Sequence, residues 1–428
     1  ATNQLTVTLQ QGGTSPQTVL QMDLSGYARP DTLKFGFSSG TGASTNFHDV
    51  RNLDVTTLTA NLWSGGAGDS LWASNTNWNP TVVPTIGADI LLDNTYVNSA
   101  QTINTGVNRS VRSLSFDTPV NYTLNNNTIE FNNQGVAGFS GIAVTQTRGT
   151  ATNTINSAIS VANAINIRNN STGALNLTGA IDTNGHTITL DGTGTATTIT
   201  GVISDTGALV KNDAGTVALN AANTYSGGTT VNGGTLTTNN NAGFGTGTVT
   251  MAGGNLTSTA SNTIANAVNL NASGTISGLT LSNTLTQTGS NTLTLGNVAL
   301  GNVALGGGTL TTKIDSGTSA ISGVISNGGL TKTGAGTLTL SGANTYTGTT
   351  TVTEGTLSLG ASDRIANASN LNLNGGTLNL NTFSEQVGTL TFSNGGGNQS
   401  VQSRSLHLLL QAPDASAFRG AQHPPTQP

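Results

Sequence analysis

The sequence contains no cysteine and very few charged or aromatic residues. Of its 428 residues, 7% are charged and 4% are aromatic. The absence of cysteine excludes disulfides, thiolate metal sites and cysteine nucleophiles. A chain this poor in large side chains cannot fill a wide globular core, but it can fill a narrow one in which small aliphatic residues stack in columns.

Basic patches and long apolar runs are also missing. The formal net charge is −5 and no basic stripe occurs, so nucleic acid is not an expected partner. No apolar run reaches the ~18 residues of a membrane-spanning helix, so none is expected in this chain. The sequence starts at Ala1 without a signal peptide, and we expect either a processed protein or a record that begins inside a larger one.

The chain instead contains a 30-residue phrase that occurs twice. Residues 207–236 and 328–357 are identical at 18 of 30 positions and lie 121 positions apart. Val217-Ala218-Leu219 and Leu338-Thr339-Leu340 alternate with the period of a strand, and Asn-Gly and Gly-Gly pairs supply tight corners between strands. An internal repeat of this kind indicates a fold built by stacking.

These features predict an all-β protein, specifically a right-handed parallel β-helix (solenoid). Thr and Val favour strands because their branched side chains are stiff and pack well on a pleated surface. The alternative is a disordered low-complexity chain, but regularly spaced Leu, Ile and Val are not expected there. A short tandem, GNVAL at 296–300 and again at 301–305, and a looser repeat of 249–256 at 371–378 extend the pattern.

Residues 1–57 differ from the rest. Leu5 to Leu9 and Val19 to Leu24 predict a strand and its returning partner across a Gly-Gly turn. The stretch 31–55, with the turn Gly36–Gly42 and the strand Phe47–Val55, resembles the last third of a bacterial L-type (legume-lectin-like) domain. The resemblance implies the C-terminal part of an antiparallel β-sandwich, which leaves a face and an edge bare.

That family binds sugar beside a calcium ion whose ligands lie on loops upstream of the segment present here. The resemblance therefore implies calcium only for a complete lectin-like domain, and no cofactor is expected for this chain. It carries over a turn that borders the sugar pocket, so the candidate carbohydrate-binding residues are Ser39, Gly40, Thr41, Gly42 and Ser44. His48, Asp49 and Arg51 are expected to orient the last strand, and this half-domain is not expected to bind sugar by itself.

Residues 58–95 contain all three tryptophans, Trp63, Trp72 and Trp78. The pattern resembles the segment that precedes β-helical repeats in autotransporter-associated proteins. A solenoid needs a cap, because an open turn exposes apolar columns and unpaired strand edges. The alternative is an aromatic platform for sugar rings, which makes Trp72 a further candidate carbohydrate-binding residue.

Residues 96–402 are predicted to carry the repeats. The phrase NTYxGxTTVxxGTL resembles the passenger-associated repeat of autotransporter proteins, a fold on which many functions are carried. Such proteins continue into a β-barrel translocator. Residues 403–428 break the pattern and do not resemble a barrel strand, so we expect a disordered, non-native or frame-shifted tail.

No cluster of residues predicts catalysis. Asp182, His186 and Asp191 are the nearest to a carboxylate site, but Asp before Thr-Asn-Gly or Gly is ordinary in turns. Asp89 and Asp93 point the same way on a strand, yet a calcium site needs six or more oxygens, so capping or turn roles are favoured. Lys211 and Lys332 recur at matched repeat positions and are interpreted as structural.

The sequence therefore predicts a non-enzymatic, extracellular β-helical stalk of an autotransporter-like passenger, acting in cell-surface adhesion or display. The expected location is the cell surface of a Gram-negative-type bacterium, with surface glycans or host and neighbouring cells as partners. A carbohydrate-binding surface protein is the second hypothesis, and a polysaccharide-degrading enzyme on the same helix is the third. The sequence predicts no oligomeric state.

Overall fold

The structure is a computed structural model that describes residues 4–9, 17–23, 60–132, 142–194, 196–393, 400–403 and 408–410. The chain divides into two compact units, Ala1–Gly201 and Val202–Pro428. Both units are built from short parallel strands, and together their described residues form about 15 turns of β-solenoid. The all-β solenoid prediction is thus confirmed, while right-handedness stays a prediction.

The first unit begins with a two-stranded hairpin. Strands β1 (Gln4–Leu9) and β2 (Gln17–Asp23) pair antiparallel, as the alternation of apolar residues predicts. The lectin-like turn and strand at 36–55 lie outside the described residues. The lectin-like part of the fold is therefore not confirmed.

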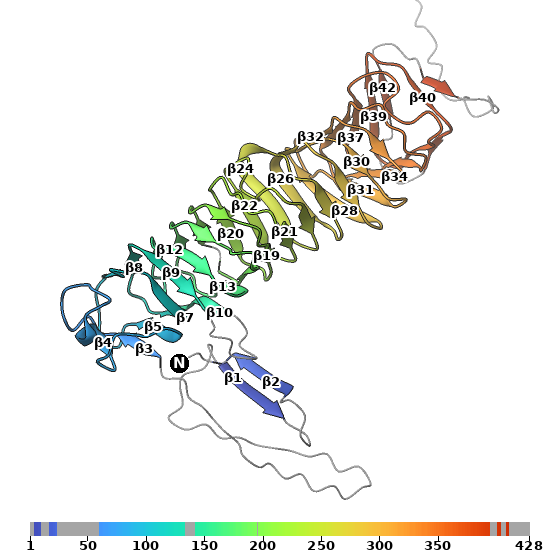
Figure 1. Ribbon diagram of the computed structural model, residues 1–428. Helices are drawn as coiled ribbons and strands as arrows, with labels where there is room; N and C mark the ends of the chain where they lie inside the picture. Colours follow the sequence, from blue (N-terminus) through green and yellow to red (C-terminus); the bar gives the residue numbers. More distant parts are fainter. Residues whose placement is uncertain are drawn as a thin grey trace, which may run out of the picture. The chain divides into compact units, whose positions relative to one another are not determined.

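The solenoid of the first unit has two mainly parallel sheets, and one or more strands of the first sheet separate successive strands of the second along the chain (Figure 1). Its elements are β3 (Asn61–Trp63), η1 (Asn75–Asn77), β4 (Trp78–Asn79), β5 (Ala88–Asp93), β6 (Gln101–Asn104), β7 (Arg109–Asp117), β8 (Tyr122–Asn125), β9 (Thr128–Phe131), β10 (Ile142–Arg148), β11 (Asn153–Ile155), β12 (Ala158–Val161), β13 (Ile165–Asn169), β14 (Leu175–Leu177), β15 (Ile181–Asp182), β16 (Ile188–Asp191) and β17 (Thr197–Ile199). Strands of successive turns pair in register, as Ile165 does with Ile188, 23 positions later.

The tryptophan segment closes the first turn of this unit. Strand β3 pairs in parallel with β5 and antiparallel with β4, and Leu71 bridges to Asn104 at the end of β6. Both strand edges of the first turn are therefore covered by residues 61–79. Parallel pairing begins with β3 and β5, inside the 58–95 segment that the sequence separates from the repeats.

The second unit repeats the same construction (Figure 1). Its strands are β18 (Ile203–Ser204), β19 (Leu209–Lys211), β20 (Thr216–Leu219), β21 (Thr229–Val231), β22 (Thr235–Thr238), β23 (Val249–Met251), β24 (Asn255–Ile264), β25 (Val268–Leu270), β26 (Gly274–Leu281), β27 (Leu285–Gln287), β28 (Asn291–Gly296), β29 (Ala299–Leu300), β30 (Val303–Ala304), β31 (Thr309–Lys313), β32 (Thr318–Ile321), β33 (Ile325–Ser326), β34 (Gly329–Thr333), β35 (Thr337–Leu340), β36 (Thr350–Val352), β37 (Thr356–Leu359), β38 (Leu371–Leu373), β39 (Thr377–Asn381), β40 (Glu385–Val387), β41 (Leu390–Phe392), β42 (Ser400–Ser403) and β43 (Leu408–Leu410).

A turn of the second unit takes about 20 residues. Leu209 pairs with Thr229 and Thr229 with Val249, each 20 positions apart. Because side chains alternate across a strand, in-register pairing sends equivalent residues of successive turns to the same side. One interior column that results consists of Leu209, Thr229, Val249, Val268, Leu285, Val303 and Ile325, all buried.

A short part of the segment 403–428 is among the described residues, and the expectation of a disordered or non-native tail stays a prediction. Strand β43 lies within residues 403–428, and it pairs in parallel with β40, with Leu408 opposite Glu385. The two residues are 23 positions apart, which is the spacing of a solenoid turn.

Candidate functional site

The repeat phrase places a buried asparagine between turns. Asn223 accepts a hydrogen bond from the Ile203 amide at 2.8 Å and donates to the Gly243 carbonyl at 2.7 Å. In the second copy, Asn344 accepts from the Ile325 amide and donates to a carbonyl of the following turn. Each asparagine thus joins three successive turns, which satisfies buried backbone groups that the strand ladders leave unpaired.

A tyrosine and a threonine complete the interior of each copy. Tyr225 shares a 2.6 Å hydroxyl–hydroxyl hydrogen bond with Thr229, and Tyr346 shares one of the same length with Thr350. All four side chains are buried. Burial raises the pKa of both tyrosines above the ordinary value, so both are neutral, structural groups.

The two matched lysines lie inside the solenoid. Lys332 is fully buried, and its Nζ donates to the carbonyls of Thr333, Gly334 and Glu354 at 2.8, 2.6 and 3.2 Å. Lys211 donates to the Asp213 carbonyl at 2.7 Å in the equivalent corner. Desolvation by burial lowers the pKa of Lys332 to about 8. The ammonium groups hold a turn together, in agreement with the structural interpretation.

We expect Lys332→Met to lower the free energy of unfolding by about 2 kcal/mol, because three carbonyls lose their buried donor. Urea denaturation of the full chain, followed by circular dichroism, measures the change. Lys313→Met is the matched control, since Lys313 pairs with Asp315 at the surface and should change stability by less than about 0.5 kcal/mol. Equal effects of the two substitutions would contradict a special role of Lys332.

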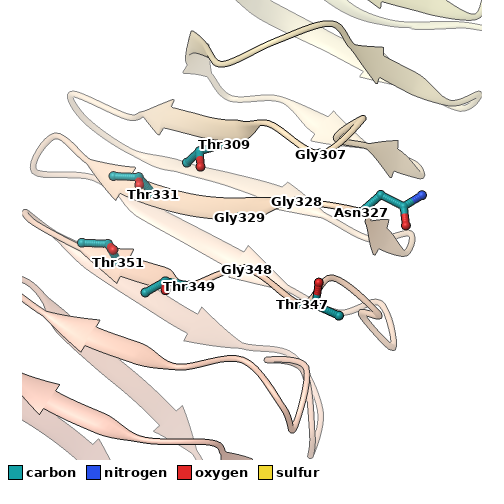
Figure 2. A pocket seen from close by; sticks show the side chains of 10 residues that line it. All are labelled: Gly307, Thr309, Asn327, Gly328, Gly329, Thr331, Thr347, Gly348, Thr349 and Thr351. Atoms are coloured by element: carbon teal, nitrogen blue, oxygen red, sulfur yellow. The ribbon is translucent and has the colours of Figure 1, made fainter.

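The described residues form an open trough on the outer side of the second unit (Figure 2). It has a volume of about 550 Å³ and crosses three successive turns. Four glycines keep it open, and five threonine side chains and one asparagine side chain border it: Gly307, Thr309, Asn327, Gly328, Gly329, Thr331, Thr347, Gly348, Thr349 and Thr351. No lining residue is charged or aromatic, so the trough offers neutral hydrogen-bonding groups and no acid–base chemistry.

The three residues considered for catalysis have structural surroundings. Asp182 accepts from the Asn184 amide at 3.1 Å, which is the geometry of an Asx turn. Asp191 lies beside Arg168, with 3.5 Å between the charged groups. The His186 amide donates to the Thr183 carbonyl in the same turn. The contacts of Asp182 and His186 match the turn interpretation, whereas Asp191 ends strand β16 with its side chain only 8% exposed.

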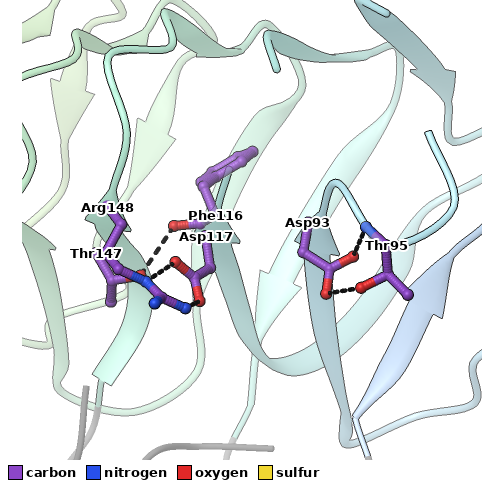
Figure 3. A network of polar contacts seen from close by, with 6 residues as sticks. All are labelled: Asp93, Thr95, Phe116, Asp117, Thr147 and Arg148. Carbon is purple, nitrogen blue, oxygen red and sulfur yellow. Dashed lines mark hydrogen bonds and ion pairs between the residues drawn. The ribbon is translucent and has the colours of Figure 1, made fainter. Parts of the chain in front are cut away.

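The carboxylates of the first turns are occupied by protein groups. Asp93 accepts from the amide and hydroxyl of Thr95 at 2.9 and 2.8 Å, and the neighbouring Asp117 pairs with Arg148 (Figure 3). Asp89 is buried and forms an ion pair with Arg112. Within the described ranges, no group of three or more His, Cys, Asp or Glu residues is arranged to hold a metal ion.

The three tryptophans form one buried cluster. The ring of Trp78 lies 5.1 Å from that of Trp63 and 4.8 Å from that of Trp72, and each side chain is only 1% exposed. Arg109 lies over the ring of Trp72, at 5.7 Å. A sugar platform needs a ring face open to solvent, so this geometry favours the cap. The carbohydrate-binding assignment of Trp72 stays a prediction.

The other candidate carbohydrate residues, Ser39, Gly40, Thr41, Gly42 and Ser44, lie outside the described residues. Their assignment also stays a prediction. In the part of the chain that the structure describes, the one helix is the three-residue η1, so no helix there is long or apolar enough to cross a membrane.

Comparison with known proteins identifies the repeat. Residues 209–237 and 330–359 match the family model described as Passenger-associated-transport-repeat. No curated protein and no solved structure matches the chain. Together with the parallel β-solenoid, the two repeats support an autotransporter passenger β-helix. That repeat family is generally structural or adhesive and indicates a secreted, surface-exposed protein of Gram-negative bacteria.

Proposed function

We propose that the chain is the β-helical stalk of an autotransporter-like passenger and acts in cell-surface adhesion or display. The observation that carries the proposal is the coincidence of the two family matches with two equivalent sets of buried asparagine, tyrosine and lysine contacts. Those networks stabilise the stack and offer no reactive group to solvent. A stalk needs stable turns more than it needs a reactive cleft.

Surface display tests this function. The full chain is fused to an unrelated translocator in a Gram-negative host, and exposure is verified by external protease. We expect several-fold more cells to be retained on epithelial or abiotic surfaces than with the translocator alone at equal density. Retention equal to the translocator control, in cells that display the folded chain, would contradict adhesion and leave display as the function.

A carbohydrate-binding surface protein is the second candidate, and the hydroxyl-lined trough favours it. Thr331→Val with Thr351→Val removes two hydroxyls while keeping the branched shape. If neutral glycans bind there, their retention on a glycan array should fall with the double variant. It should persist with Thr339→Val on another column, and chelation of calcium should have no effect. Trp72→Ala is unsuitable here, because a buried side chain changes stability as well.

A polysaccharide-degrading enzyme is the third candidate and has the weakest support. A solvated Asp182 in an Asx turn and an Asp191 beside Arg168 offer no paired acid and base. We expect no new reducing ends from a panel of polysaccharides. Product formation that Asp182→Ala or Asp191→Ala abolishes would establish the enzyme instead.

A further inference from the structure

One buried carboxyl group stands where the repeats place a neutral amide. Asn344 accepts the amide hydrogen of Ile325 at 2.7 Å, and Asn223 makes the same contact in the first copy. Two turns after Asn344, Glu385 accepts the amide hydrogen of Ile365 at 3.1 Å. The donor and acceptor are 20 positions apart in this pair and 19 in the Asn344 pair. Glu385 therefore makes the same side-chain-to-backbone bridge between turns as the two asparagines, but with an ionisable group.

The carboxyl group of Glu385 holds a corner of the preceding turn. Its second oxygen accepts from the Arg364 amide at 2.8 Å, and the residue is 1% exposed. The guanidinium of Arg364 points elsewhere, to the carbonyls of Ser362 and Ser341 at 2.8 and 3.3 Å. Two backbone amides are thus the contacts that offset the burial of this charge.

The positive charge of Arg364 favours the ionised form of Glu385, but it is the smallest of the contributions to the pKa of this group. Asp363 adds a second negative charge, and Tyr346 is buried and uncharged. Strand β43 pairs in parallel with β40. Desolvation outweighs the two amide bonds and raises the pKa of Glu385 from 4.5 to about 7, and Asp363 adds to the rise.

We propose that Glu385 is a pH-sensitive latch, which ties the corner at residues 361–366 to β40 firmly when it is protonated and more loosely when it is ionised. Because the pKa is higher in the closed corner than in the open one, the closed form binds the proton more tightly. Closure is therefore most stable below pH 4.5, weakens as the pH rises towards 7, and changes little above that.

Hydrogen exchange of the full chain tests the latch. After correction for the intrinsic pH dependence of exchange, protection of the amides of Arg364 and Ile365 should fall by up to about 300-fold between pH 4.5 and 7.5. Glu385→Gln, a neutral isostere, should make the protection independent of pH. The same slope in both proteins, or no slope in the unmodified chain, would overturn the proposal.

The second repeat provides a matched gain-of-function variant. Asn344→Asp places a carboxyl group in the bridge to Ile325 and should make protection of the Ile325 amide depend on pH, while Glu385 continues to control 361–366. If the Asn344→Asp chain folds and protection of its Ile325 amide does not depend on pH, then a buried carboxyl group at this position is not sufficient to create the latch. If this variant does not fold, the Glu385→Gln comparison still decides.

Discussion

Trp78→Ala should lower the free energy of unfolding of the first unit, residues 1–201, by about 3–5 kcal/mol. The substitution removes the partner of both Trp63 and Trp72, and the hydrogen bond from the Trp78 indole to the Trp72 carbonyl at 2.8 Å. The space left cannot collapse easily, because β3 and β4 are tied to the edge of the first turn. Urea denaturation followed by circular dichroism measures the loss.

Val82→Ala is the control for this prediction. Val82 is 57% exposed in the same segment, so its truncation should change stability by less than about 0.5 kcal/mol. The cap interpretation and the sugar platform differ in their outcome. A Trp78→Ala chain of unchanged stability that loses glycan binding would reverse the assignment of the tryptophan segment.

The fold of the repeats could be predicted from the sequence, because each turn of a stacked fold makes the same contacts as the turn before it. The inward direction of Lys211 could also have been predicted, since Leu209 lies two positions earlier and alternation puts both on one side of the strand. Lysine is seldom buried, so alternation alone is weak evidence for an inward Lys211. The recurrence of lysine at the matched position, Lys332, is the signal that the position is structural. What the sequence could not supply is the carbonyl cluster that accommodates the ammonium group.

The trough and the latch were not predictable, because both depend on which residues of different turns come together. Thr311, Thr331 and Thr351 form one in-register column, with 20 residues between successive members. Other turns of the second unit take between 17 and 23 residues, so the register cannot be found by counting a fixed interval along the sequence. A single misplaced residue moves a whole strand to the opposite face. Glu385 has no repeated counterpart of its own type, so only the contact with Ile365 reveals its equivalence to Asn344.

Columns of hydroxyl groups explain why the outer surface is so poor in charge. Thr318, Thr337, Thr356 and Thr377 stand in register on four successive turns of the second unit. Like charges placed directly opposite one another on neighbouring strands would repel, whereas threonine is uncharged and favours the strand. A parallel stack with identical columns therefore selects threonine and asparagine over lysine and glutamate on its outside.

Gly355→Ala should lower the free energy of unfolding of the second unit by about 3 kcal/mol, because two costs combine. The residue has a φ of +63°, and a Cβ there would lie 2.4 Å from the carbonyl oxygens of both Gly334 and Gly336. The first repeat has a glycine at the same position, Gly234, with a φ of +62° and the same crowding. Thermal and urea unfolding of the full chain measure the loss.

Two controls separate the causes. Gly307 has a φ of +86° and open space where a Cβ would be added. Gly307→Ala therefore carries the conformational cost alone and should lower the free energy of unfolding by about 1 kcal/mol. Gly233→Ala meets its nearest atom at 3.4 Å and should be nearly neutral, since Glu354 already occupies that position in the second repeat. If Gly355→Ala destabilised the chain no more than Gly307→Ala, the close approach of successive turns would not be the reason that position 355 requires glycine. The conserved feature of the two repeats would then be the backbone conformation of the corner alone.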